Sequence, residues 1–270
     1  VQEVRTSTLD FGDVIKREKN ILELDNPAEM NYKLNTLALK AGYRDQSSLE
    51  KLIVDQIQYE SQKGILDIAD LFALDIQREY LIPDILPTPS VVLIYGAGGD
   101  GKSMSAWTMA KHIATGDPFL VRGSKVPVEQ GNVLLLNGDQ PLSQLKEQLK
   151  ENNFPIESNV KIQTDWQLQR YAQFIKLMQT YTPKLVVIDS LIGCSGGRAF
   201  DENKSDFAQP LYWLTRNNGV LFPRTTILII HHANKNGGFR GKSAIRDAVD
   251  ETWKLSKPTQ EKINKDGRNS

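Results

Sequence analysis

Residues 96 to 103 carry the sequence Gly-Ala-Gly-Gly-Asp-Gly-Lys-Ser, between an apolar stretch of strand length and an amphipathic stretch of helix length. The strand candidate is Val91–Tyr95 and the helix candidate is Lys102–Thr115. A glycine-rich turn in this position lets several backbone N–H groups converge on one anion, and the helix N-terminus adds partial positive charge. This feature constrains the fold most, because it requires the strand–loop–helix unit of an α/β domain.

The pattern Gly-x4-Gly-Lys-Ser is that of a phosphate-binding loop. In such a loop the lysine contacts the β- and γ-phosphates, and the serine hydroxyl binds Mg²⁺. The sequence therefore predicts a site for ATP and Mg²⁺, with Lys102 and Ser103 in these two roles. A glycine-rich turn that only matches the pattern is the alternative, and the flanking strand and helix argue against it. The predicted phosphate-contacting residues are Gly96, Gly98, Gly99, Gly101, Lys102 and Ser103.

Apolar stretches of strand length alternate with amphipathic stretches of helix length along the chain after Leu81. Short apolar strands separated by helices indicate a mostly parallel sheet with helices on both faces, which is an α/β fold. The predicted strands are Val91–Tyr95, Asn132–Leu136, Val160–Gln163, Leu185–Ile188 and Thr225–Ile230. The predicted helices are Lys102–Thr115, Leu142–Lys150, Gln167–Thr180 and Lys204–Asn217.

Residues 1–75 differ in character from residues 76–270. The first segment is polar and mainly helical, with apolar residues at helical spacing in Val14–Leu24 and Leu49–Ile57. We expect it to be a linker, a docking element or an oligomerisation element. Prolines between Ile82 and Pro89 break any helix and mark the entry to the nucleotide-binding domain.

The composition excludes several classes of site and partner. The 33 Lys and Arg residues balance the 33 Asp and Glu residues, so contact with nucleic acid would need a local basic patch. The single cysteine, Cys194, excludes an intramolecular disulfide and favours a reducing, cytoplasmic setting. No apolar run has the length of a membrane span, so we expect no membrane partner. The start at Val1 and the polar end Lys262–Ser270 suggest part of a longer protein.

Two predicted strands lead into aspartates. Asp189 ends its strand, and the carboxyl end of a parallel strand faces the crevice where nucleotides bind, so we expect Asp189 to hold Mg²⁺ directly or through water. Asp139 follows the strand Asn132–Leu136 and is a candidate to orient or deprotonate the attacking water. The alternative for each aspartate is a capping role in the turn or helix that follows.

His231 and His232 follow the last predicted strand. Neighbouring side chains on a strand point to opposite faces, so the two imidazoles cannot easily bind one metal ion, and we reject a histidine metal site. One of them could donate a hydrogen bond to the γ-phosphate. We favour His232, with His231 as a close rival, and a pair of purely structural histidines stays equally open.

The segment Lys235–Arg246 is the most basic stretch near the predicted site, and it has three glycines and no acid. It is a solvated loop, a contact for a nucleic-acid backbone, or the source of a cation for the γ-phosphate of a neighbouring subunit. The residues proposed for contact with DNA or with a neighbouring subunit are Lys235, Arg240 and Lys242.

From Arg78 to about Ser256 the chain resembles the RecA-like ATPases, most closely the branch that contains hexameric replicative helicases of plasmid RepA type. The phosphate loop is the most specific part of this resemblance. The other segments that carry it are Arg78–Pro83, Gly116–Leu120, Asp201–Asn203, His231–Lys235 and Arg240–Ala244.

The resemblance implies a RecA-like P-loop NTPase fold, ATP hydrolysis with Mg²⁺, a homo-oligomer of six subunits and single-stranded DNA as partner. It implies catalytic roles for Lys102, Asp139, Asp189 and His232, with Ser103 and Asp189 at the metal. It also implies that the strand Thr225–Ile230 lies between the phosphate-loop strand and the Asp189 strand. Arg240 or Lys242 would serve a channel loop or the site of the next subunit.

Asp139 departs from the family, which usually has a glutamate there. The shorter side chain must lie closer to its water, so we expect slow turnover. The leading hypothesis from the resemblance is an ATP-driven motor on single-stranded DNA. The alternative is a nucleotide-gated assembly or regulatory ATPase without unwinding activity, which the departure and the zero net charge favour slightly.

Overall fold

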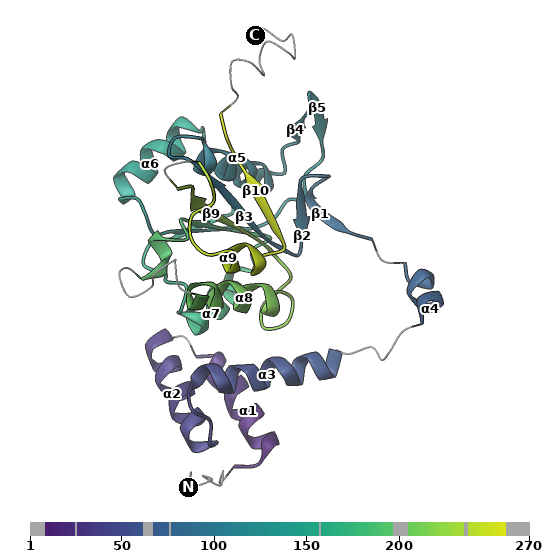
Figure 1. Ribbon diagram of the computed structural model, residues 1–270, viewed down its shortest axis with the longest axis vertical. Coiled ribbons are helices and arrows are strands. Elements are labelled where there is room, and N and C mark those ends of the chain that lie inside the picture. The colour runs from purple at the N-terminus through teal and green to yellow at the C-terminus, as the bar shows by residue number, and fades with distance from the viewer. Residues whose placement is uncertain are drawn as a thin grey trace. The chain divides into compact units, whose positions relative to one another are not determined.

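The computed structural model describes residues 9–24, 26–61, 67–75, 77–156, 158–196, 205–234 and 237–257 (Figure 1). The chain divides into two compact units. The first comprises Val1–Glu79, Arg170–Thr182 and Arg216–Arg224, and the second comprises Tyr80–Gln169, Pro183–Thr215 and Thr225–Ser270.

The second unit is built on a six-stranded sheet in which every neighbouring pair of strands is parallel. The strand order is β10-β3-β9-β8-β6-β7. This confirms the predicted α/β fold, and β9 lies between β3 and β8 as the resemblance implies. The strands are β3 (Ser90–Gly96), β6 (Val133–Asn137), β7 (Val160–Gln163), β8 (Leu185–Asp189), β9 (Thr226–His232) and β10 (Glu251–Lys254).

Both faces of the central strands are buried. On one face, Val92, Val187 and Leu228 pack against the helix α5 (Lys102–Thr115). On the other face, Leu93 and Ile229 are equally inaccessible. Figure 1 shows α5 and α6 (Leu142–Glu151) on one side of the sheet, and α9 (Ala244–Asp247) with the first part of α8 (Gln209–Asn217) on the other. Helices on both faces explain why the strands are apolar throughout instead of alternating.

Several elements differ from the sequence-based prediction. The helix α7 (Tyr171–Tyr181) begins four residues later than predicted, because the backbone of Leu168 donates to the carbonyl of Cys194 (2.8 Å) and the Gln169 amide to that of Ser195 (3.1 Å). The predicted helix from Lys204 is divided into a 3-10 turn, Ser205–Ala208, and α8. Strand β10 was not predicted, because its short polar sequence forms a strand only by pairing with β3. Two short strand pairs are also additional: β1 (Glu79–Ile82) with β2 (Leu86–Thr88), and β4 (Phe119–Val121) with β5 (Ser124–Val126).

The first unit is helical in its described residues. The helices α1 (Phe11–Leu22), α2 (Pro27–Lys40) and α3 (Gln46–Ser61) pack on one another, and α1 and α2 also contact α7. The short helix α4 (Ile68–Ala73) follows them along the chain. Among the described residues, no helix combines the length and apolar character that crossing a membrane requires. Whether this segment is a linker, a docking element or an oligomerisation element stays a prediction.

Two glutamates are buried together in this helical unit. Glu18 on α1 is fully buried and Glu50 on α3 is nearly so. Glu50 Oε1 accepts a hydrogen bond from the Gln46 amide (2.7 Å), whereas both oxygens of Glu18 have no hydrogen-bond partner among the described residues. Burial, with a smaller contribution from the charge of Glu50, raises the pKa of Glu18 to about 9. Glu18 is therefore a neutral carboxylic acid at pH 7.

Since the pKa of Glu18 is raised on folding, the unfolded chain loses this proton at lower pH than the folded chain does. The free energy of unfolding should therefore fall as the pH rises from about 5 to about 9. The variant Glu18→Gln should flatten this slope and be more stable than the original chain near pH 9, which urea unfolding at a series of pH values would measure. Glu23→Gln, an exposed change at the end of the same helix, is the control. An unchanged slope in Glu18→Gln would contradict the prediction.

Candidate active site

Asp100 forms a hydrogen bond within the loop between β3 and α5. The Asp100 carboxylate accepts a hydrogen bond from the backbone N–H of Ala97 (2.8 Å). Gly99 and Gly101 have φ angles of 77° and 87°, in the left-handed region that favours glycine. A Cβ added to Gly98 or Gly101 would meet no atom within 4 Å. The loop thus leaves open space beside these two glycines, as a phosphate group requires.

Gly96 is needed for a different reason. A Cβ at this position would collide with the backbone carbonyl of Leu255, in the segment that follows β10. The carbonyl of Gly96 also accepts the backbone N–H of Ala233 (2.8 Å), just after β9. The first glycine of the loop is therefore held between the strands on either side of β3.

Lys102 is the first residue of α5, and only 5% of its surface is exposed. Its ammonium donates to the carbonyls of Gly96 (3.0 Å) and Ala97 (2.7 Å), so it lies on the inner side of the loop. Burial lowers the pKa of Lys102, and the charges of Asp100 and Asp189 oppose that shift. The first turn of α5 contains no acid, so its N-terminal partial charge is available to an anion.

Asp189 ends β8 with 6% of its surface exposed. Burial raises its pKa, a hydrogen bond with the Ser103 hydroxyl opposes this, and the charge of Asp139 adds to the rise. Its Oδ2 atom is buried and has no hydrogen-bond partner among the described residues. A buried carboxylate oxygen beside a serine hydroxyl is a donor set that suits Mg²⁺, so these residues fit the metal that a phosphate loop implies.

Asp139 and His232 face each other from the ends of β6 and β9, with β8 between these strands. The nearest atoms are His232 Nε2 and Asp139 Oδ2, 3.4 Å apart. The hydrogen bond with His232 is the largest cause that lowers the pKa of Asp139, burial opposes it, and a hydrogen bond with Ser190 lowers it further. The helix α6 has Pro141 at its cap position and no side-chain cap, so Asp139 does not cap it.

Close contact between two glycines brings the acids together, which the sequence analysis did not anticipate. The backbone N–H of Gly138 donates to the carbonyl of Asp189 (2.8 Å). A Cβ at Gly193 would lie 2.7 Å from the carbonyl carbon of Gly138 and would collide with the Asp139 carboxylate. A glycine directly before Asp139 and another soon after Asp189 are the only sequence signals for this contact.

The adjacent histidines have different surroundings. His231 is fully buried, and its Nε2 lies 2.8 Å from the carbonyl of Arg240, so that nitrogen carries the proton and donates. The ring of Phe239 packs against His231 (centroids 5.2 Å apart) and Tyr95 (5.1 Å). His231 therefore fixes the basic segment to the sheet, whereas His232 faces Asp139.

Of the three predicted basic contacts, Lys235 lies outside the described residues. Arg240 and Lys242 belong to the described part of the segment, Gly237–Arg246, and the backbone carbonyl of Arg240 lies 2.8 Å from His231 Nε2. Phe239 anchors this part, and the guanidinium of Arg246 lies 5.1 Å from the centre of its ring. The choice between DNA and a neighbouring subunit for Arg240 and Lys242 stays open.

Comparison with known proteins agrees with this architecture. The family model described as AAA domain matches residues 56–238, more than half of the chain. The chain therefore belongs to the AAA domain family, and this match, with a phosphate loop that follows β3 of a parallel sheet, supports a RecA-like P-loop ATPase domain. Among solved structures, the KaiC-like protein of the hyperthermophilic archaeon Pyrococcus horikoshii OT3 is similar over 66% of this chain and 79% of its own, at 14% identity and a TM-score of 0.44. No curated protein matches the chain.

The close contact between Gly138 and Gly193 predicts that the variant Gly193→Ala is less stable than the original chain. The added methyl group has no room between Gly138 and Asp139, so we expect a loss of about 1–3 kcal/mol in the free energy of unfolding. Gly12→Ala in α1 is the control, because its Cβ would make only an ordinary contact, 3.4 Å from Asp10. Urea unfolding of both variants checks this, and equal stabilities would contradict the close contact.

Proposed function

We propose that this chain is an ATP-hydrolysing motor domain of the hexameric replicative helicase type, which assembles as a ring and acts on single-stranded DNA. The observation that supports hydrolysis is the position of Asp189. It lies between the phosphate loop, through Ser103, and the pair formed by Asp139 and His232. Residues that can contact a phosphate, a metal ion and a water molecule thus lie at one edge of the sheet.

In this proposal the glycines of the loop and Lys102 hold the β- and γ-phosphates. Ser103 and Asp189 hold Mg²⁺, which when bound neutralises charge on the phosphate oxygens. The ion would also satisfy the buried oxygen of Asp189 that has no partner among the described residues. Lys102 would exchange its two loop carbonyls for phosphate oxygens, which are stronger acceptors for an ammonium.

The role of Asp139 follows from its pKa. A general base works best when its pKa lies near the ambient pH, and the pKa of Asp139 is lowered below the ordinary aspartate value. Asp139 is thus ionised but weakly basic. While its contact with His232 persists, it is better suited to orient a water through a hydrogen bond than to remove the proton of that water before attack.

His232 would detect the γ-phosphate. It lies directly opposite Gly96 in the pairing of β3 and β9, so its side chain starts beside the phosphate loop. When the γ-phosphate is present, the imidazole can turn from Asp139 towards it. Loss of that phosphate on hydrolysis would return His232 to Asp139, and a two-state contact of this kind can drive a motor.

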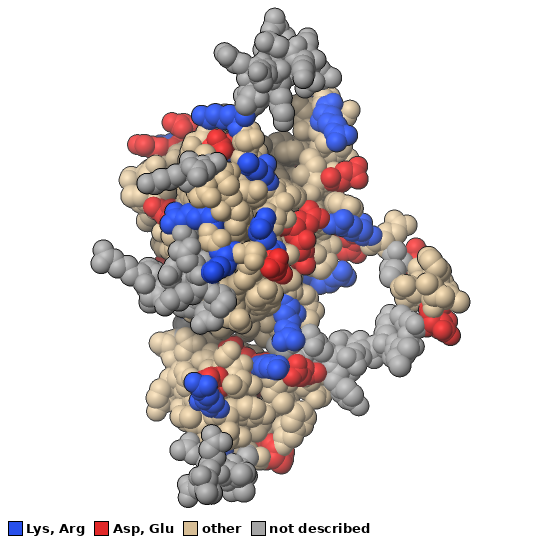
Figure 2. All heavy atoms as spheres, viewed as in Figure 1, with Lys and Arg blue, Asp and Glu red and all other residues tan. Residues whose placement is uncertain are grey.

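Contact with DNA would come from a local patch. On the face that Figure 2 shows, Lys and Arg side chains of the described residues are interspersed with Asp and Glu, in agreement with the zero net charge. In this proposal Arg240 and Lys242, with Lys235, contact the DNA backbone or the nucleotide of the next subunit. The alternative remains a nucleotide-gated assembly or regulatory ATPase, which the shorter acid at 139 favours.

The variant Asp139→Asn tests the role of the acid. It keeps the size of the side chain but removes its charge, so we expect turnover to fall roughly 100-fold or more while ATP affinity stays within about threefold. Phosphate release and calorimetric titration measure the two quantities. Asp84→Asn, in the turn between β1 and β2, is the isosteric control. Unchanged turnover in Asp139→Asn would refute the assignment.

The proposed motor activity is tested by adding single-stranded DNA. We expect DNA to stimulate ATP turnover, and DNA binding to weaken steeply as salt rises, because released counterions drive such binding. Mass measurement in solution, with and without ATP and DNA, should show six copies when both are present. If DNA neither binds nor stimulates turnover while ATP is still hydrolysed, the motor is excluded and the regulatory ATPase remains.

A further inference from the structure

The short helix α4 has no buried residue. Its large apolar side chains are spaced three and four residues apart, so they share one face, and all are exposed: Ile68 by 72%, Leu71 by 46% and Phe72 by 81%. A helix of six residues is marginal in water by itself, because most helical stability in proteins comes from the packing of an apolar face. The apolar face of α4 therefore calls for a surface to pack on.

The segment that contains α4 is also acidic. Asp67, Asp70 and Asp75 lie in the helix or next to it, and residues 67–75 contain no lysine or arginine. Opposite charges across an interface select the partner and fix its register. A surface that covers α4 should therefore combine apolar side chains with positive charge.

A groove of about 340 Å³ between α1 and α2 has this combination. Its apolar wall includes Ile21 and Leu37, which also pack in the core of the helical unit. Three cations line it, Arg17, Lys33 and Lys40, and no acid does so among the described residues. The groove between α1 and α2 thus has the apolar and basic character that α4 requires.

The cations of this groove are available to an acidic partner. Lys33 forms an ion pair with Glu29 (2.6 Å), one turn earlier in α2, and both side chains are about half exposed, so this pair is weak. Arg17 and Lys40 form no ion pair with a described residue. Tyr32, which also lines the groove, is 72% exposed. The single chain therefore leaves both the groove and α4 open to solvent.

We infer that α4 of one copy docks in the α1–α2 groove of a second copy, so that the helical unit joins copies of this chain. The apolar face of α4 packs on Ile21 and Leu37, and its aspartates pair with Arg17 and Lys40. The contact is head-to-tail, so each copy keeps a groove or an α4 for a further neighbour. This inference does not rest on the proposed function, because both surfaces belong to the helical unit.

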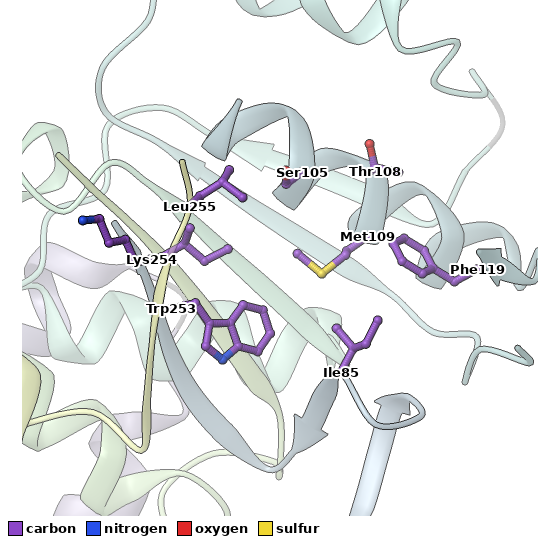
Figure 3. A pocket seen from close by; sticks show the side chains of 9 residues that line it. Ile85, Ser105, Thr108, Met109, Phe119, Trp253, Lys254 and Leu255 are labelled. Atoms are coloured by element: carbon purple, nitrogen blue, oxygen red, sulfur yellow. The ribbon is translucent and has the colours of Figure 1, made fainter. Parts of the chain in front are cut away.

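A second apolar cavity fits α4 less well. It measures about 310 Å³ and lies beside α5 and β10, where Figure 3 shows Met109, Phe119 and Trp253 around it. Among the described residues that line it, Lys254 alone is charged. One cation against three aspartates gives little charge complementarity, so the α1–α2 groove is the better match.

The mass of the full chain in solution tests this inference, measured without nucleotide or DNA over a range of concentrations. The mass of the original chain should rise with concentration. Phe72→Ser on α4, and the double variant Arg17→Glu/Lys40→Glu in the groove, should each weaken association roughly tenfold or more. Two exposed changes elsewhere, Ile156→Ser and Lys125→Glu on β5, are the matched controls and should leave association unchanged.

Mixing the two impaired variants distinguishes docking between copies from docking within one chain. The Phe72→Ser chain retains its groove and the groove variant retains its α4. An equimolar mixture should therefore form pairs of twice the single-chain mass, at concentrations where each variant alone stays single. Circular dichroism shows whether the variants are folded, and Arg17→Glu alone replaces the double variant if that chain is not.

The inference is overturned if the original chain stays single at every concentration, or if the mixture does not associate. It is also overturned if the groove variant loses binding to single-stranded DNA while its association is unchanged, because the groove would then be a nucleic-acid site. None of these masses depends on ATP turnover, so failure of this inference is distinguishable from failure of the proposed function.

Discussion

The parallel pairing of β3, β9, β8 and β6 is the constraint on which the candidate site depends. Because the carboxyl ends of parallel strands meet at one edge of the sheet, residues far apart in the sequence meet there. Gly96, Asp189 and His232 are the last residues of three adjacent strands, and Asp139 follows the fourth by two residues. The register of the pairing places these strand ends together, with Gly96 opposite His232 and Asn137 opposite Asp189.

Two carboxylates at this edge have opposite pKa shifts because their surroundings differ. Asp189 is nearly inaccessible, so burial dominates and raises its pKa, whereas Asp139 is partly exposed and the contact with His232 lowers its pKa. A buried carboxylate whose oxygen lacks a partner among the described residues is costly unless a cation neutralises it. Burial therefore destabilises the charged form of Asp189, and a divalent ion would offset this cost. The charge of Asp139 is already stabilised by its contact with His232.

The sequence correctly predicts those elements whose ends are set by residues next to them in the chain. The limits of α5 agree with the prediction because glycines in the left-handed conformation, Gly101 and Gly116, flank the helix. Elements decided by distant contacts were missed, such as β10, which depends on pairing with β3, and the late start of α7. The difference between local patterns and distant contacts also holds at the candidate site. Local patterns place the phosphate loop and the aspartates at strand ends, whereas the contact between Gly138 and Gly193 depends on packing between segments more than fifty residues apart.

The two histidines show how a change at the phosphates could reach the basic segment. His232 faces the site. The preceding residue, His231, is hydrogen-bonded to the carbonyl of Arg240 and packs against Phe239. Because these neighbours share one rigid strand, a displacement of β9 at His232 would also move the anchor of the segment. Gly237 and Gly241, on either side of Phe239, both have left-handed φ angles that few other residues tolerate. The hydrogen bond of His231 and the packing of Phe239 thus tie the backbone of Arg240 to β9.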